Sequence, residues 1–281
     1  MTTSMSESLR DLDRLEDRIR QHRQVDKSPV LIVEGSDDLL VLRAHVERVT
    51  LFAADGKPKA LAAVRALNHM GEVGVRAIVD ADFDDEPDHD LHGMVHTYEG
   101  RDLEAMLISL GVLQHLLEHL GSASKLSAVG GPSAAAQLVL DSALPLAGMR
   151  YANRVNGWSL RFDAVDPTSK ANKTTLTLDT RRYAASLLSV SESRAIADDV
   201  VAASAQVPPD GRGPRGKDVA AFAGLSLRTK FASLSHTAVG EELIAAQIRS
   251  SGGLALAHSR WLSSIRESLA AAEEELRSLA A

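Results

Sequence analysis

Two stretches decide the fold: VLIVEGSDD, Val30 to Asp38, and VRAIVDADFDD, Val75 to Asp85. Each is a short apolar run, rich in β-branched residues, that passes directly into acidic residues. Runs of this kind are typical of buried parallel strands. In open α/β sheets, ligands bind beyond the carboxyl ends of the strands, so Glu34, Asp80 and Asp82 are expected to converge there. Carboxylates at one point repel one another unless a cation holds them, which indicates a metal site.

The residues around these stretches alternate between strand and helix patterns. Further strands are expected at 49–55 and 94–98, and helices at 38–46, from Pro58 to about Met70 and at 101–120. Ser36 and Asp37 are good candidates to cap the first of these helices. The alternation predicts an α/β fold with a parallel sheet, flanked by helices and joined by right-handed crossovers.

The remainder of the chain has no further strand–helix alternation. We expect three parts: an N-terminal amphipathic helix within 1–27, an α/β domain at 28–120 and a mainly helical C-terminal region at 121–281. Pro145 is expected to break a helix, 158–166 to be extended and 206–218 to be a flexible loop. The last helix, 258–280, has an apolar stripe that indicates core packing or, alternatively, a partner helix; the stripe contains Leu262, Ile265, Leu269, Leu276 and Leu279.

The composition excludes several classes of protein. The chain has no cysteine, so structural disulfides, zinc-thiolate sites and iron–sulfur clusters are excluded. The first residues are too polar for a secretory signal, and no apolar run approaches the ~20 residues that span a bilayer. We therefore expect a cytoplasmic protein that does not enter a membrane.

The charge is unevenly distributed along a chain whose net charge is −7. Ten acidic residues and one arginine lie between Asp80 and Glu104, whereas Arg150 to Lys217 holds eleven basic and seven acidic residues. An acidic metal site beside a mildly basic surface suits a phosphate substrate. An ordinary patchy surface explains the charge equally well.

The acidic motifs themselves indicate which metal is expected. Asp80 and Asp82 would present their carboxylates on one side if extended geometry continues past the strand. A site with oxygen ligands alone selects a hard ion, Mg²⁺ or Mn²⁺. Asp37 and Asp38 open the following helix and are candidate ligands of a second ion. The alternative is that these acids only cap a helix and form a solvated loop.

These motifs resemble the Toprim domain, a Rossmann-like fold found in topoisomerases, bacterial primases and nucleases. Its pattern is Glu–Gly after the first strand and Asp-x-Asp after the third, matched here by Glu34, Gly35, Asp80 and Asp82. The resemblance covers roughly Pro29 to Leu120. Within this superfamily the chain is most similar to stand-alone bacterial Toprim nucleases, such as the effector of the PARIS anti-phage system, which are related to the overcoming-lysogenization-defect nucleases.

The resemblance implies a Mg²⁺- or Mn²⁺-dependent nuclease. Glu34 would act as metal ligand or general base, and Asp80 and Asp82 would hold metal, with Asp37 or Asp38 completing a second site. RDLEAML looks like the family's Asp–Leu–Glu helix, which implies that Glu104 is a metal ligand, and GRGPRGKDV makes Lys217 a candidate phosphate ligand. The implied substrate is tRNA or DNA. The implied partner is a separate ABC-type ATPase, because the chain has no GxxxxGK[ST] loop, and a homodimer is also considered.

Several alternatives stay open. A topoisomerase would need one of Tyr98, Tyr151 and Tyr183 as nucleophile, and none is in an evident winged-helix context. His89, His92 and His96 could form a zinc site or lie at the surface. Basic residues elsewhere are either phosphate contacts or ordinary surface charge: Lys170, Lys173, Arg181, Arg182, Arg212 and Arg215. Finally, the chain could be a Toprim-like regulatory or assembly subunit that binds metal or nucleotide and cleaves nothing.

Overall fold

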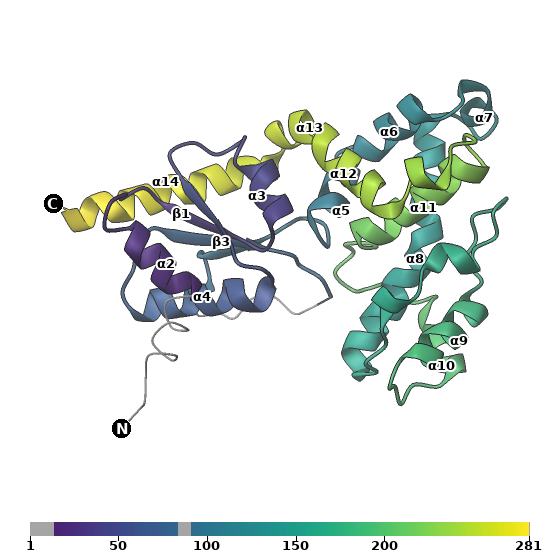
Figure 1. Ribbon diagram of the computed structural model, residues 1–281, viewed down its shortest axis with the longest axis horizontal. Helices are drawn as coiled ribbons and strands as arrows, with labels where there is room; N and C mark the ends of the chain where they lie inside the picture. Colours follow the sequence, from purple (N-terminus) through teal and green to yellow (C-terminus); the bar gives the residue numbers. More distant parts are fainter. Residues whose placement is uncertain (1–13, 84–90, 281) are drawn as a thin grey trace. The chain divides into compact units, whose positions relative to one another are not determined.

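The computed structural model describes residues 14–83 and 91–280, and these form two compact units. The sheet unit contains residues 14–80, 91–98 and 257–280. The helical unit contains residues 81–83 and 99–256. The two units can be followed in the ribbon diagram (Figure 1).

The sheet unit is built on a four-stranded parallel sheet in the order β2-β1-β3-β4. Its strands are β1 (Val30–Val33), β2 (Thr50–Ala53), β3 (Val75–Val79) and β4 (Val95–Thr97). The central pair, β1 and β3, is completely buried, as expected of apolar strands covered on both faces. Val30 pairs with Val75 and Val33 with Ile78, so β1 and β3 end at the same edge of the sheet.

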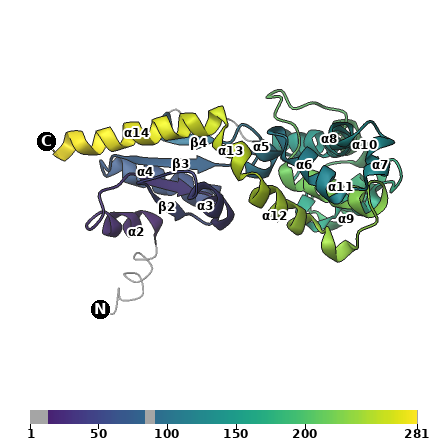
Figure 2. The same cartoon turned by 90° about the horizontal axis from the view of Figure 1, so that it is seen from above.

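Helices cover both faces of this sheet. The unit contains α2 (Leu15–His22), α3 (Ser36–Leu42), α4 (Lys57–His69) and α14 (Arg260–Ala280). Alternate residues of β1 and β3 pack with α2 and α4 in one hydrophobic core. The C-terminal helix α14 lies along the other side of the sheet (Figure 2).

A buried arginine joins α14 to the sheet. Arg76, the second residue of β3, forms an ion pair of 2.5 Å with Glu275 of α14 and donates a hydrogen bond to Ser268. His96 of β4 is hydrogen-bonded to the same serine hydroxyl. A charge buried in a strand needs partners, and here α14 supplies them.

The described residues of the helical unit form no sheet, and its helices range from the five residues of α7 to the 25 residues of α8. Its longest helix, α8, packs with α6, α10 and α11, and α11 packs with α5 and α12. The helices of the unit are α5 (Leu103–Ser109), α6 (Val112–Leu120), α7 (Ala123–Ser127), α8 (Pro132–Asn156), α9 (Thr180–Val190), α10 (Ala197–Ala203), α11 (Gly216–Thr229) and α12 (Glu241–Ser251), with α13 (Gly253–Ala257) at its end.

The α/β class, the parallel sheet and the helical region are confirmed, but the division of the chain differs from the expected boundary at residue 120. Helices α5 and α6 belong to the helical unit, because they pack with α11, α12 and α8. Helix α14, expected in the C-terminal region, belongs to the sheet unit through Arg76. Its stripe forms core as expected at Leu262, Ile265 and Leu269, whereas Leu279 is exposed.

Three local predictions were wrong. Pro145 does not break a helix, because α8 continues through it and is packed against four neighbouring helices, α6, α7, α10 and α11. The segment 158–166 is not extended, since it contains the 3₁₀ helix Phe162–Ala164. The helix expected over 101–120 is divided at Gly111, whose φ of 90° is outside the helical region. The predicted helix within 1–27 is confirmed only as α2, and its earlier residues lie outside the described part of the chain.

Candidate functional site

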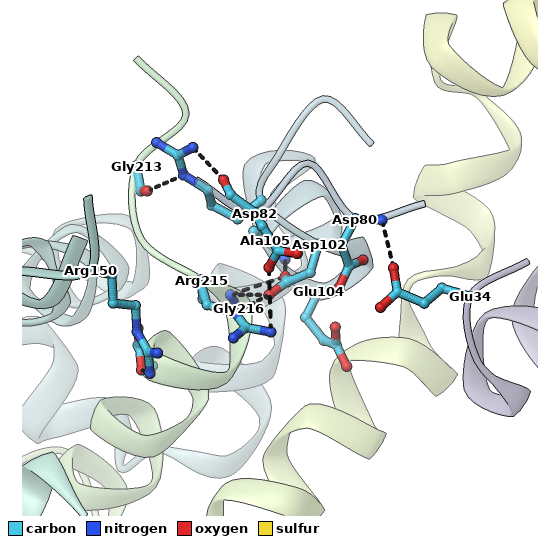
Figure 3. Close-up of polar contacts among 12 residues, drawn as sticks. Glu34, Asp80, Asp82, Asp102, Glu104, Ala105, Arg150, Gly213, Arg215 and Gly216 are labelled. Carbon is cyan, nitrogen blue, oxygen red and sulfur yellow. Dashed lines mark hydrogen bonds and ion pairs between the residues drawn. The ribbon is translucent and has the colours of Figure 1, made fainter. Parts of the chain in front are cut away.

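The predicted site residues fall into two groups that belong to different units. Glu34, Asp37, Asp38 and Asp80 are in the sheet unit, whereas Asp82, Glu104 and Lys217 are in the helical unit. Figure 3 shows the polar contacts around most of them.

In the sheet unit, Glu34 and Asp80 lie together as predicted. Glu34 follows β1 and Asp80 follows β3, the neighbouring strand. The backbone N–H of Asp80 donates a hydrogen bond of 3.1 Å to Glu34 Oε2 (Figure 3). This bond holds the Glu34 carboxylate at the carboxyl edge of the sheet, beside the Asp80 residue.

Asp38 has a structural role in the same unit. Its Oδ2 accepts the backbone N–H of Gly35 at 3.0 Å, which caps the start of α3. Its Oδ1 accepts the hydroxyl of the buried Tyr98 at 2.6 Å. The cap therefore comes from Asp38 and not from Ser36 or Asp37 as predicted. Because both Asp38 oxygens accept hydrogen bonds, a metal ion would have to compete with them.

Asp82 does not share a face with Asp80 through continued strand geometry. Strand β3 ends at Val79, and Asp82 has a φ of 48°, in the left-handed region that non-glycine residues rarely adopt. Arg101 holds this turn from both sides: its backbone carbonyl accepts the Asp82 N–H at 3.1 Å, and its guanidinium donates to the Asp82 carbonyl. Arg101 thus stabilises the turn at Asp82 through both its backbone and its side chain.

Arg101 also anchors the glycine-rich loop at 206–215. It is 1% exposed and donates two hydrogen bonds, of 2.5 and 2.6 Å, to the carboxylate of Asp210. Its Nε donates to the carbonyl of Gly213 at 3.1 Å, and its guanidinium lies 4.0 Å from the ring centroid of Phe83. This loop, expected to be flexible, is therefore tied to the Asp82 turn.

Asp102 is a buried carboxylate that the sequence did not single out as a site residue. Its Oδ1 caps α5 by accepting the N–H of Ala105 at 2.8 Å, and both oxygens are 3.0 Å from the N–H of Gly216 (Figure 3). Burial, and then the charge of Glu104, raise the pKa of Asp102 to about 6. The N–H groups and Arg215 offset this only in part. The Asp–Leu–Glu motif contains Asp102, and its place before a helix was the available signal.

Glu104 itself is buried and paired. Its Oε1 accepts a hydrogen bond from Arg249 of α12. Gly216 packs directly against this helix start: an added Cβ would lie 2.3 Å from Glu104 Cβ and 2.6 Å from the Ala105 nitrogen. The segment GRGPRGKDV therefore contacts the start of α5 within the helical unit.

The basic residue beside these acids is Arg215 and not Lys217. Arg215 Nη2 lies 3.8 Å from Asp82 Oδ1, and its Nε lies 3.7 Å from Asp102 Oδ2. Both distances exceed those of charge-assisted hydrogen bonds, about 2.7–2.9 Å. Its buried Nε makes no hydrogen bond to any part of the chain that the structure describes. Lys217 is exposed, and its charge acts on Glu241 instead.

The other candidates do not assemble into a site. Tyr98 and Tyr183 are buried, and Tyr98 is bonded to Asp38. His96 is in β4 and bonded to Ser268, while His89 lies outside the described residues. Across residues 14–83 and 91–280, no group of three or more His, Asp or Glu is arranged to hold a metal ion.

Comparisons with protein-family models, curated proteins and solved structures return no significant match. The functional assignment therefore depends on the residues and their geometry. No helix in the described part of the chain is long and apolar enough to cross a membrane.

Proposed function

We propose that this chain is a metal-dependent nuclease of the Toprim type that hydrolyses phosphodiester bonds. The observation that supports this most is the Glu34–Asp80 pair, at the carboxyl ends of two adjacent central strands, in which the backbone N–H of Asp80 donates a hydrogen bond to the Glu34 carboxylate. Ligand sites of open parallel sheets are found at this edge.

The donor chemistry of this pair fits Mg²⁺ or Mn²⁺. Mg²⁺ is commonly held by one or two carboxylates, with waters and substrate phosphates completing its coordination, so a preformed cage of three acids is not required. Glu34 Oε1 and the carboxylate of Asp80 would hold the ion. When bound, such an ion supplies Lewis acidity to a phosphate oxygen. The Asp80 N–H orients the Glu34 carboxylate, which can also accept a proton as general base.

In the helical unit, Asp82 and Glu104 remain proposed ligands of a second ion on the strength of the resemblance. Glu104 would have to exchange Arg249 for that ion. Arg215 replaces Lys217 as the proposed phosphate ligand. Its guanidinium lies near two carboxylates, at distances longer than hydrogen bonds, and its Nε has no hydrogen-bond partner among the described residues. A planar guanidinium fork matches the oxygens of a phosphate.

The resemblance also supports the wider proposal. The chain would act in the cytoplasm as a toxic effector of bacterial anti-phage defence, cutting tRNA or DNA under the control of a separate ABC-type ATPase. Control by a partner has a physical rationale, since an unregulated nuclease would damage its host.

A cleavage assay tests the proposal. Plasmid, linear DNA, bulk tRNA and ribosomal RNA are incubated with Mg²⁺ or Mn²⁺ and the wild type, Glu34→Gln or Glu118→Gln, each with and without the candidate ATPase. Glu118→Gln is the matched control, because that carboxylate is on the exposed side of α6. We expect Glu34→Gln to lower the rate by roughly 10²- to 10⁴-fold, and the control to cleave like the wild type.

The second candidate function is a regulatory or assembly subunit that binds an ion but cleaves nothing. One observation favours it: both carboxylate oxygens of Asp38 already accept hydrogen bonds, so this acid is less available to a second, catalytic ion. Calorimetric titration with Mn²⁺ separates the two functions. Ion binding that Glu34→Gln abolishes, without cleavage of any substrate in the presence of the ATPase, would establish the regulatory role.

A further inference from the structure

The sheet unit contains a pocket at the edge opposite the Glu34–Asp80 pair. It has a volume of about 310 Å³ and is lined by Pro29 and Val49, which immediately precede β1 and β2, and by residues of α14. Parallel strands have their amino ends at one edge, so this pocket is on the far side of the sheet from the carboxyl ends. Its volume is at the lower end of those that hold small molecules, about 300–1,000 Å³.

The pocket has an apolar floor. Val46 and Leu269 line it and are only 8% and 5% exposed, and Pro29, Val49 and Ala270 add further apolar surface. An apolar floor gains free energy by covering the apolar body of a ligand.

The rim of the pocket carries two arginines and two acids. Arg48 and Arg266 are both exposed and line the pocket, together with His45, Glu47 and Glu273. Glu273 forms an ion pair with Arg277, which also pairs with Glu274, so the charge of Glu273 is compensated only in part. Burial, and then the charge of Arg266, lower the pKa of His45, which favours its neutral form. The two arginines are therefore the groups of the rim that can bind an anionic head, beside the opposing charges of Glu47 and Glu273.

The two arginines are presented in different ways. Arg266 is fixed at the rim, because its Nε and Nη2 both donate to the carbonyl of His45, at 3.1 and 3.0 Å. Arg48 has a φ of 56°, the left-handed conformation that glycine or asparagine would adopt with less strain. Strained residues concentrate at ligand sites, where the side chain is needed for binding.

We infer that this pocket binds a small amphipathic anion, a single carboxylate or phosphate head with an apolar body. The head lies between Arg48 and Arg266, and the body covers Val46 and Leu269. This site is separate from the proposed nuclease chemistry, and its test requires no cleavage.

Calorimetric titration of the full chain tests the inference with four probes. n-Octyl phosphate and octanoate carry both features, inorganic phosphate carries the head alone, and octanol carries the body alone. We expect saturable binding of at least one of the first two, about ten-fold tighter than either control probe. The tighter of n-octyl phosphate and octanoate identifies the head group.

Two variants and one control locate the site. Arg48→Asn removes the charge but suits the left-handed backbone, so it should weaken binding about ten-fold while the melting temperature stays equal or rises. Ala270→Phe should block the pocket without changing its charge. Arg43→Asn, an exposed arginine of the same unit outside the pocket, should bind like the wild type. The inference is overturned if neither amphipathic probe binds below about 10 mM, or if Arg48→Asn binds as tightly as Arg43→Asn.

Discussion

Arg101 is predicted to hold the helical unit's acidic turn and its glycine-rich loop in place, and Arg101→Met tests this. Methionine is similar in length but has no donors. The substitution removes the bidentate pair with Asp210 and the hydrogen bonds to the carbonyls of Asp82 and Gly213. The side chain of Asp210 is 38% exposed, so water can compensate its carboxylate. The two carbonyls and the contact with Phe83 account for most of the loss.

The expected cost is about 3 kcal/mol, because hydrogen bonds from a charged donor contribute about 1.5–3 kcal/mol each. Urea unfolding followed by circular dichroism measures it, and limited proteolysis reports cleavage within 206–215. Arg181→Met is the matched control: its ion pair with Asp198 is exposed on both sides, so we expect a change below about 0.5 kcal/mol. If Arg101→Met unfolds like this control and its loop is no more sensitive to protease, the anchoring role is refuted.

Three further predictions concern contacts within one unit. Gly216→Ala would bring a Cβ within 2.3 Å of Glu104 Cβ, so we expect a loss of about 1–3 kcal/mol; an unchanged melting temperature would contradict this. The raised pKa of Asp102 means that the folded state binds more protons than the unfolded state between about pH 4 and 6. Wild-type stability relative to Asp102→Asn, measured with chelator, should therefore fall by about 3 kcal/mol as pH rises through that window. A stability difference between the wild type and Asp102→Asn that does not change with pH would contradict the raised pKa of Asp102. Glu275→Ala leaves the charge of Arg76, whose side chain is 7% exposed, without its ion-pair partner. We expect the free energy of unfolding in denaturant to fall by about 2 kcal/mol. A denaturation midpoint equal to that of the wild type would contradict this.

The sequence by itself determined the parallel sheet and the acids that follow its central strands. Apolar, β-branched runs separated by helical patterns have few alternatives in a chain of this length, and residues that follow parallel strands share an edge because of the topology. The position of Glu34 beside Asp80 was therefore predictable. The apolar stripe of the last helix was also predictable, but not the surface on which it packs.

Only the tertiary structure decided which helix joins which unit and which groups compensate each buried charge. Arg76 attaches α14 to a strand nearly two hundred residues earlier, and Arg101 connects Asp82 with Asp210 across most of the helical unit. Single ion pairs have no sequence period, so no local pattern indicates them. The same reason explains why Arg215, and not Lys217, lies beside the acids. The position of Arg215 depends on how the loop at 206–215 is anchored, and contacts between residues far apart in the sequence determine that anchoring.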